Sequence, residues 1–446
     1  MNHEKCLELR NTHTDFYYKS FNVEETHEEY VITFHFLVPE LAEFRPCIKI
    51  EKKMLVNTNM EYINFLAFHI GLVELISYWK CTCSPNVIVE AGSITGDQIT
   101  WFLKMYYHGL GEFFYVNGIT LAEDDFMNII CNGPNIIKPY LHYHGTGNLI
   151  AIGGGKDSSV ALEVLAGEDN ICTMMNPKEP GIECMKVAGY DEYIKYTRTI
   201  DPNLLELNDK GYLNGHTPFN ALVAFTTYLV AYLSDKKHIV LSNEGSANEE
   251  TVIGTNINHQ YSKSYEFEND FREYSDKYLG GHIEYFSLLR CLNELQVALI
   301  FSQYKKYHSV FKSCNVGSKS APWIWCRKCP KCLFVFIILS PFLTEEELIN
   351  IFGSNLYEDD SLLDTFKELL GYGETKPFEC VGTIGEIRYA VSLAVDKFDK
   401  LPYLLKFYKE NYPLELDVDY IKAFNEEHNI KPEFLKKLEG ELKKYV

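Results

Sequence analysis

The chain has 446 residues and a formal net charge of -20; 46% of its residues are hydrophobic and 23% are charged. This length allows two or three domains, and the composition is typical of a globular protein with a sizeable core. The acidic balance argues against a broad nucleic-acid surface, because such surfaces are usually basic. The 13 cysteines, with no secretory leader among the first residues, indicate free thiols or a metal site in a cytoplasmic protein.

The first 145 residues are expected to form an α+β domain. EYVITFHFLVP (29–39) and RPCIKIEKKMLV (45–56) carry β-branched and aromatic residues in alternation, which predicts strands. EYINFLAFHIGLVELISYWK (61–80) has apolar residues at helical spacing and predicts a helix. The longest apolar runs, ALVAFTTYLVAYL and CLFVFIILSPFL, are too short or too polar to span a bilayer comfortably, so we expect buried core helices and no membrane association.

The rest of the chain divides into two further regions. From 146 to 343, short apolar runs alternate with amphipathic stretches, which is typical of βα units around a parallel sheet. From 344 to 446 the sequence is charged, acid-rich and helical in pattern, as in TEEELINIFG and FLKKLEGELKKYV. The prediction is therefore an α/β fold with an N-terminal α+β region and a helical C-terminal region.

Three consecutive glycines, Gly153, Gly154 and Gly155, stand between a predicted strand, NLIAI, and a predicted helix, DSSVALEVL. A strand-to-helix turn directs free backbone N–H groups and the helix dipole at one point, where an anion fits. The residues that follow add a positive charge and hydroxyl donors: Lys156, Ser158 and Ser159. A tight turn made for packing alone would explain the glycines but not the residues after them.

The run GGGKDSS resembles the S-G-G-x-D-S loop of the PP-loop ATP pyrophosphatases, which split ATP into AMP and pyrophosphate. The match runs from Gly154 to Ser158 and departs at Gly153, where that family usually has Ser. The resemblance implies a PP-loop sheet within 146–343, ATP and Mg²⁺ as cofactors, and adenylation as the reaction. The nucleotide would then be bound by the whole loop, residues 153–159.

Two further roles follow from the same resemblance. Asp157 would help to place Mg²⁺ and the pyrophosphate, and Lys156 would stabilise the departing pyrophosphate. Asn176 ends the next predicted strand, NICTMMNP, where contacts to adenine are expected at the edge of a nucleotide-binding sheet.

A second motif lies in SCNVGSKSAPWIWCRKCPKC, where one cysteine precedes a C-x2-C-x2-C run: Cys314, Cys326, Cys329 and Cys332. Four thiolates at this spacing can close a tetrahedral zinc site, and the apolar helix that follows favours a structural one. The alternative is a chance cluster of core cysteines. Such a knuckle after a PP-loop also resembles 7-cyano-7-deazaguanine synthase, although that family is a short single domain.

The third informative stretch is LSNEGSANEETVIGTNINHQYSKSYEFENDF (241–271), which follows the predicted strand HIVLS. It is too polar and too rich in aromatic residues for an ordinary connection, although a solvated loop is the alternative. With SYWKCTCSPNV, GLGEFFYVNGI, WCRKCPKCLFVF and KPFECVGT, it resembles a family of ATP-dependent epimerases over residues 60–395. Those enzymes invert the terminal L-Glu of UDP-N-acetylmuramoyl-L-alanyl-L-glutamate, a peptidoglycan precursor.

The resemblance to the epimerases implies a UDP-muramoyl dipeptide as the substrate. Adenylation of the glutamate carboxylate would mask its charge and acidify the α-proton, which a base then removes. The candidates for the base are Cys380, His259, Glu244 and His216, although a lone cysteine such as Cys380 is as often a small buried hydrophobe. The candidates for binding the substrate are Ser246, Asn248, Gln260, Lys263 and Arg388.

Two other classes of function remain open at this point. One is an adenylating synthase or ligase for another substrate, of the 7-cyano-7-deazaguanine synthase type. The other is a nucleotide-binding, zinc-stabilised protein without turnover. The sequence does not decide the oligomeric state.

Overall fold

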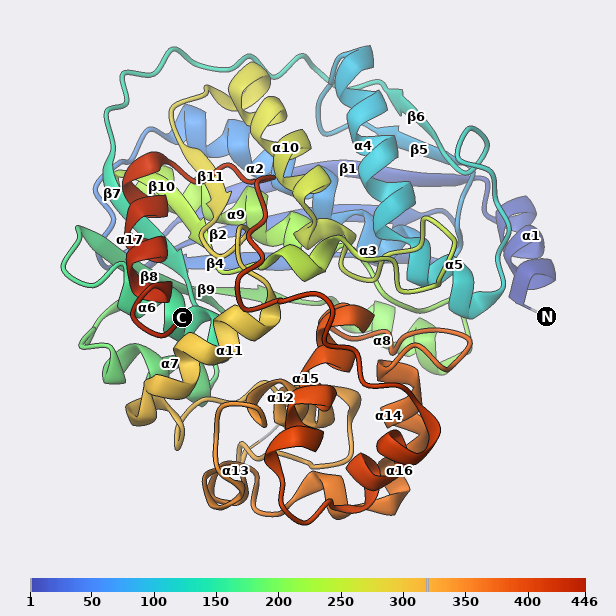
Figure 1. Cartoon of the computed structure of the whole chain (residues 1–446). Helices are drawn as coiled ribbons and strands as arrows, with labels where there is room; N and C mark the ends of the chain where they lie inside the picture. The colour runs from blue at the N-terminus through green and yellow to red at the C-terminus, as the bar shows by residue number, and fades with distance from the viewer. Residues whose placement is uncertain (1, 318, 320) are drawn as a thin grey trace.

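The structure, a computed structural model, describes residues 2–317, 319 and 321–446. Within these residues, one mixed sheet of 11 strands crosses the molecule (Figure 1). From one edge to the other, with β3 (Ala42–Phe44) paired to β2, the strands are β11 (Glu284–Ser287), β10 (Lys236–Leu241), β7 (Thr146–Ala151), β8 (Asn170–Met175), β9 (Tyr193–Thr199), β4 (Cys47–Glu51), β2 (Glu29–Val38), β1 (Asp15–Glu25), β5 (Asn86–Val89) and β6 (Asn128–Cys131).

The half of the sheet from β11 to β9 is parallel throughout. Strands β8 and β9 follow β7 on one side, while β10 and β11 lie on its other side, so the strand order reverses between β7 and β10. In open α/β sheets, ligands bind beyond the carboxyl ends of the strands at such a reversal. The expected α/β fold is confirmed, while the PP-loop label stays a prediction.

The N-terminal strands extend the same sheet. Strand β4 pairs antiparallel with β9, which places Cys47 opposite Thr199 and Ile50 opposite Tyr196. Strand β2 pairs antiparallel with both β1 and β4. On the other side of β1, β5 pairs parallel with β1, and β6 pairs parallel with β5. The boundary expected near residue 145 therefore falls inside one continuous sheet.

The central strands are buried on both faces, because neighbouring residues along a strand point in opposite directions. Leu149 and Ile239 contribute to one hydrophobic core, and Ile150 and Val240 to the other. The helices of the first core include α2 (Met60–Glu74), α4 (Gly96–Gly109), α9 (Phe219–Leu233) and α10 (Tyr265–Tyr274). Those of the second include α6 (Lys156–Val164), α7 (Glu179–Val187), α11 (Glu294–Gln303) and α12 (Pro330–Leu339).

The C-terminal region is helical, as predicted, and groups around α12 on one side of the sheet (Figure 1). Its helices are α13 (Glu345–Phe352), α14 (Leu363–Leu369), α15 (Ile384–Lys397) and α16 (Tyr403–Asn411). The last helix, α17 (Pro432–Leu442), returns to α6 and α11. The remaining α-helices of the described residues are α1 (Asn2–Thr12), α3 (Ile76–Trp79), α5 (Gly111–Asn117) and α8 (Pro202–Asp209).

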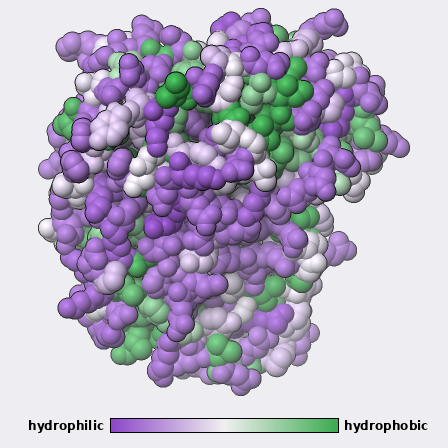
Figure 2. All heavy atoms as spheres, turned by 90° about the horizontal axis from the view of Figure 1, so that it is seen from above, coloured by the Kyte–Doolittle hydropathy of each residue, from purple (hydrophilic) through white to green (hydrophobic). Residues whose placement is uncertain are grey.

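One helical stretch, Met60–Trp79, is long and apolar enough to cross a bilayer, but 83% of its most apolar window is buried inside the protein. It begins at Asn59, whose side chain accepts hydrogen bonds from the N–H groups of Glu61 and Tyr62 and so caps α2. The stretch packs against α9 and β1 as a core helix. The molecular face in Figure 2 is mostly hydrophilic, with its hydrophobic atoms gathered in small areas.

Candidate active site

The glycine loop lies between β7 and α6, at the reversal of strand order. Gly154 has a φ of +87°, and a Cβ there would lie 2.5 Å from the backbone nitrogen of Gly181. A Cβ on Gly155 would lie 2.7 Å from Ser313 Oγ, whereas one on Gly153 would meet nothing within 4 Å. Packing thus explains Gly154 and Gly155, but it does not require a glycine at 153.

Lys156 is almost completely buried at the start of α6, with 1% of its side chain exposed. Its ammonium forms ion pairs with Asp157 and with Glu294, the first residue of α11. Although burial opposes the charge, the carboxylates of Asp157, Glu294 and Glu244 raise the pKa of Lys156. The lysine predicted to face a phosphate is therefore also the counter-ion of buried acids.

More acidic side chains than the single ammonium of Lys156 lie in this part of the site. Burial, with Glu244 and Asp157 nearby, raises the pKa of Glu294 to about 8 against the opposing effect of Lys156. The carboxylate of Glu386, on α15, accepts a hydrogen bond of 3.0 Å from the N–H of Glu294. Surplus carboxylates of this kind are the ligands that Mg²⁺ prefers, together with substrate phosphates. The sequence did not identify Glu294 or Glu386, because each looks like an ordinary first-turn helix residue.

The polar stretch after β10 is folded against the protein rather than solvated. Arg290, fully buried, donates to the carbonyl of Glu244 at 2.9 Å and to the carbonyl of Lys263 at 2.6 Å. The Glu244 carboxylate accepts a hydrogen bond of 2.9 Å from Ser246 Oγ. Gln260 Nε2 donates to the carbonyl of Val381 at 3.4 Å, which joins this stretch to the segment before α15.

A second cluster forms around the thiol of Cys380, which is half-buried in the segment before α15. Lys263 Nζ donates to Cys380 Sγ at 3.0 Å. His259 lies beside the same thiol, and its Nδ1 is hydrogen-bonded to Glu112 on α5. His216 Nδ1 lies 3.4 Å from the same Glu112 oxygen, and the two imidazole rings are 4.5 Å apart between centroids.

Three of the four residues predicted as bases, Cys380, His259 and His216, are thus brought together, while Glu244 lies with Ser246 near Lys156. Glu112 was missed, although it stands in the block GLGEFFYVNGI that supported the family resemblance. The ligand atoms of Glu112, His216 and His259 lie within 4.8 Å of one another, so this trio also has the spacing of a metal site.

The cations around the thiol change its charge state. Burial alone would raise the pKa of Cys380, but Lys263, His259 and Lys331 lower it to about 6. Against burial, Cys380 and Glu112 raise the pKa of His259 to about 9. Burial and the charge on His259 lower the pKa of His216 to about 4. At neutral pH the cluster is a thiolate paired with an imidazolium, beside a neutral imidazole.

Lys263 connects the two clusters into one site. Its burial opposes the charge, but Cys380, Glu244 and Asp157 all act to raise its pKa. At the same place, a Cβ on Gly382 would lie 3.2 Å from Glu294 Cγ, so the segment that carries the thiol touches the acids around Lys156. The thiolate, Lys263 and the acids beside the glycine loop therefore form one continuous charged site.

Other predicted residues have local partners instead. Asn176 has a φ of +46°. Its side chain is hydrogen-bonded to the backbone of Arg198, which joins the end of β8 to β9. Arg388 Nη1 pairs with Glu415 at 3.0 Å and its Nε donates to the carbonyl of Leu370. Asn248 Oδ1 accepts from the N–H of Tyr265. Roles for these three in binding the nucleotide or the substrate stay predictions.

The four motif cysteines converge on one point. The distances between sulfurs are 3.8 Å for Cys314 and Cys329, 3.8 Å for Cys326 and Cys332, and 3.5 Å for Cys329 and Cys332. Tetrahedral zinc with bonds of about 2.3 Å needs sulfurs about 3.8 Å apart. Backbone N–H groups also point at the sulfurs, including that of Gly317 at 3.0 Å from Cys314 Sγ. The arrangement fits a closed four-thiolate zinc site, and the zinc itself stays a prediction.

The knuckle formed by these cysteines contacts the thiol segment through Lys331. Its backbone N–H donates to the carboxylate of Glu379 at 2.8 Å, and its ammonium donates to the carbonyl of Cys380. Lys331 lies between two motif cysteines in C-P-K-C. The position of the Cys380 thiol therefore depends on how the knuckle is folded.

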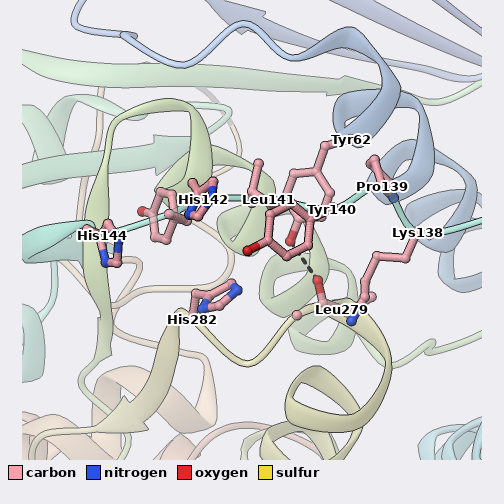
Figure 3. Close-up of a pocket in the computed structure, with 11 residues that line it drawn as sticks. Tyr62, Lys138, Pro139, Tyr140, Leu141, His142, His144, Leu279 and His282 are labelled. Atoms are coloured by element: carbon pink, nitrogen blue, oxygen red, sulfur yellow. Dashed lines mark hydrogen bonds between the residues drawn. The ribbon is translucent and has the colours of Figure 1, made fainter.

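A large pocket, of about 460 Å³, lies elsewhere (Figure 3). Its lining comes from residues 138–144, directly before β7, and from residues just before β11, so it lies at the amino ends of the parallel strands. Tyr140 and Tyr62 lie near each other in the lining, and the Tyr62 hydroxyl donates to the carbonyl of Leu279 at 2.6 Å. Because the carboxyl ends are where α/β sheets bind ligands, the volume of this pocket does not make it the active site.

The geometry defines a doubly wound α/β protein with a charged site at its switch point. The sequence matches two family models, described as MurL N-terminal domain over residues 8–288 and MurL C-terminal domain over residues 310–410. The chain belongs to the MurL family. This confirms the resemblance to the epimerases, while membership of the PP-loop superfamily stays a prediction.

Relatives of this chain carry one name, UDP-N-acetyl-alpha-D-muramoyl-L-alanyl-L-glutamate epimerase. The protein of Xanthomonas oryzae pv. oryzae is 34% identical over 376 residues, which cover 81% of this chain and 82% of the relative. That of Salinispora tropica is 37% identical over 330 residues, covering 71% and 70%. That of a Micromonospora species is 35% identical over 336 residues, covering 73% and 74%. No solved structure matches the chain significantly.

The charge state of the thiol can be measured by alkylation. Because the pKa of Cys380 is about 6, its labelling by iodoacetamide should be half-maximal near pH 6 and level off above neutrality. Lys263→Met removes the cation that lowers the pKa of Cys380 most and should move the midpoint upward by at least one pH unit, as followed by mass spectrometry of the Cys380 peptide. The exposed Lys210→Met is the control. A wild-type midpoint near pH 9 would contradict the thiolate.

The knuckle can be tested by elemental analysis. We expect one zinc per chain, held by Cys314, Cys326, Cys329 and Cys332. Cys326→Ser should release the metal and lower the melting temperature or the solubility, because a closed site contributes folding free energy. Cys131→Ser, at a half-buried cysteine outside the knuckle, should keep the zinc. A folded, active chain without metal would refute the zinc assignment.

Proposed function

We propose that this protein is an ATP-dependent epimerase that inverts the terminal L-Glu of UDP-N-acetylmuramoyl-L-alanyl-L-glutamate for peptidoglycan synthesis. One observation carries the proposal: in a chain of the MurL family, a thiolate stabilised by Lys263 lies next to the acids beside a glycine loop suited to phosphate. The loop suits adenylation of the carboxylate, and the thiolate cluster suits chemistry at the carbon beside it. The named activity of the relatives supports the substrate class.

The first half of the reaction would occur at the glycine loop. The carboxylate of the substrate glutamate attacks the α-phosphate of ATP, and pyrophosphate leaves. The backbone N–H groups at the start of α6 and the ammonium of Lys156 face the charge that develops on the phosphates. Asp157 is half-buried beside Lys156, where it is suited to holding Mg²⁺, which would neutralise phosphate charge.

Activation of the carboxylate makes the second half of the reaction possible. A free carboxylate is negatively charged and opposes formation of a carbanion at its α-carbon. In the mixed anhydride with AMP that charge is masked, so the α-proton is more acidic. Cys380 and His259 are the groups that this site offers for moving the proton. Return of a proton to the opposite face inverts the centre, and hydrolysis then frees the carboxylate.

The nucleotide products provide the first test of the proposal. Incubation with the UDP-muramoyl dipeptide, ATP and Mg²⁺ should yield AMP and pyrophosphate rather than ADP. Asp157→Ala should lower the rate by on the order of a hundredfold or more, because a charge contact to the transition state is lost. Asp191→Ala, at an exposed aspartate, should leave the rate unchanged. Release of ADP and phosphate by the wild-type chain would exclude adenylation.

Proton exchange provides the second test. When the reaction is run in D₂O, deuterium should enter the glutamate α-carbon of the product, because the proton must leave that carbon for inversion to occur. Mass spectrometry measures the deuterium, and chiral analysis after hydrolysis measures D-Glu. If ATP is converted to AMP without deuterium at this carbon, the protein is an adenylating synthase or ligase. If ATP binds without turnover, it is not an enzyme of either kind.

A further inference from the structure

The thiolate cluster has the geometry of a nucleophile as well as that of a proton carrier. A carboxylate, an imidazole and a thiol lie together: His259 Nδ1 is hydrogen-bonded to Glu112, and His259 also lies beside the thiol of Cys380. They come from α5, from the stretch after β10 and from the segment before α15. A carboxylate that orients an imidazole beside a thiol is the arrangement by which cysteines attack acyl groups.

We propose that Cys380 forms a covalent thioester with the substrate glutamate, and that the α-proton is removed from this thioester rather than from the adenylate. This rests on the proposed function, which supplies the activated carboxyl group. The acyl acceptor is thus the chain itself, and AMP leaves before inversion begins.

The step is balanced without any further reactant. The thiolate sulfur of Cys380 attacks the carbonyl carbon of the mixed anhydride and forms a C–S bond. The C–O bond to the phosphate breaks, and its electron pair leaves with AMP, which needs no proton. Lys263 Nζ, 3.0 Å from the sulfur, is placed to stabilise the negative charge that passes through the carbonyl oxygen.

Acylation also converts His259 into a base. The thiolate is one of the two groups that raise the pKa of His259, and it disappears when the sulfur is acylated. The imidazolium can then lose its proton to solvent, and the neutral imidazole can accept the α-proton. The thioester carbonyl stabilises the resulting carbanion, because it is uncharged. After a proton from solvent adds to the other face, His259 again carries a proton; water then cleaves the C–S bond to give the carboxylate and the thiolate, and both protons of this hydrolysis are released to solvent.

The low pKa of Cys380 favours this role over that of a simple base. Lowering the pKa of a thiol reduces its affinity for a proton in full proportion. The logarithm of its rate of attack falls by only about half of the drop in pKa, since the Brønsted coefficient is about 0.4–0.5. The neighbouring cations Lys263, His259 and Lys331 therefore make Cys380 a much weaker base but keep most of its reactivity toward an acyl carbon.

The test is a single-turnover reaction with enzyme in excess over the UDP-muramoyl dipeptide, in the presence of ATP and Mg²⁺. Samples are quenched with acid at short times and analysed by intact-protein mass spectrometry, peptide mapping and AMP assay. We expect an adduct on Cys380 with the mass of the substrate less one water, which neutral hydroxylamine removes. His259→Gln should accumulate this adduct, because the thioester then forms but loses its α-proton slowly.

Two variants complete the design. Cys380→Ala should still make AMP but show no adduct and at least a hundredfold slower inversion, whereas Cys47→Ala, at a half-buried cysteine in β4, should behave as the wild type. If samples that contain AMP show no hydroxylamine-sensitive adduct in either the wild type or His259→Gln, the thioester is excluded. Inversion at the wild-type rate by Cys380→Ala would exclude it as well. Absence of dipeptide-dependent AMP from the wild type would instead refute the proposed function.

Discussion

The site depends on one buried ammonium, that of Lys263. Without it, the thiolate of Cys380 would lose the cation that lowers its pKa most, whose Nζ lies 3.0 Å from Sγ. A buried lysine normally loses its charge, but the negative groups around Lys263 keep its pKa high. Its place is fixed in turn by Arg290, which donates to the carbonyls of Lys263 and Glu244 and pairs with Glu268. A fully buried guanidinium thus holds the backbone on which both charge clusters rest.

This dependence explains why no single region of the chain could form the site. Glu112 comes from the N-terminal region, Asp157 from the glycine loop, and Cys380 from the helical C-terminal region. The continuous sheet holds the first two regions in a fixed relation through the pairing of β4 with β9. The third is held by contacts at its entry, where Gly382 lies against Glu294. Opposite charges buried this closely are stable only when every group has a partner, so the regions must fold together.

The sequence predicted the local features of this molecule and missed the non-local ones. The glycine turn and the knuckle were predictable because their residues are neighbours in the chain and their spacing is set by backbone geometry. The pairing of β4 with β9 joins distant segments, so alternation identified β4, whereas β9 and its contact with β4 were not predicted. Glu294 and Glu112 carry no local signal, because an acid in the first turn of a helix is stabilised by the helix dipole wherever it occurs. Only tertiary contacts distinguish them from surface acids.

The two kinds of cysteine site in this region differ in their surroundings as well as in their sequence context. The knuckle sulfurs face backbone N–H groups and one another, an environment that suits a metal and leaves no open position. Cys380 faces side-chain cations instead, an environment that stabilises a free thiolate. Lys331 belongs to both, because it lies within the C-P-K-C run and binds the carbonyl of Cys380. The knuckle next to Cys380 therefore has a physical effect: through Lys331 it fixes the backbone of a segment that has no regular secondary structure of its own.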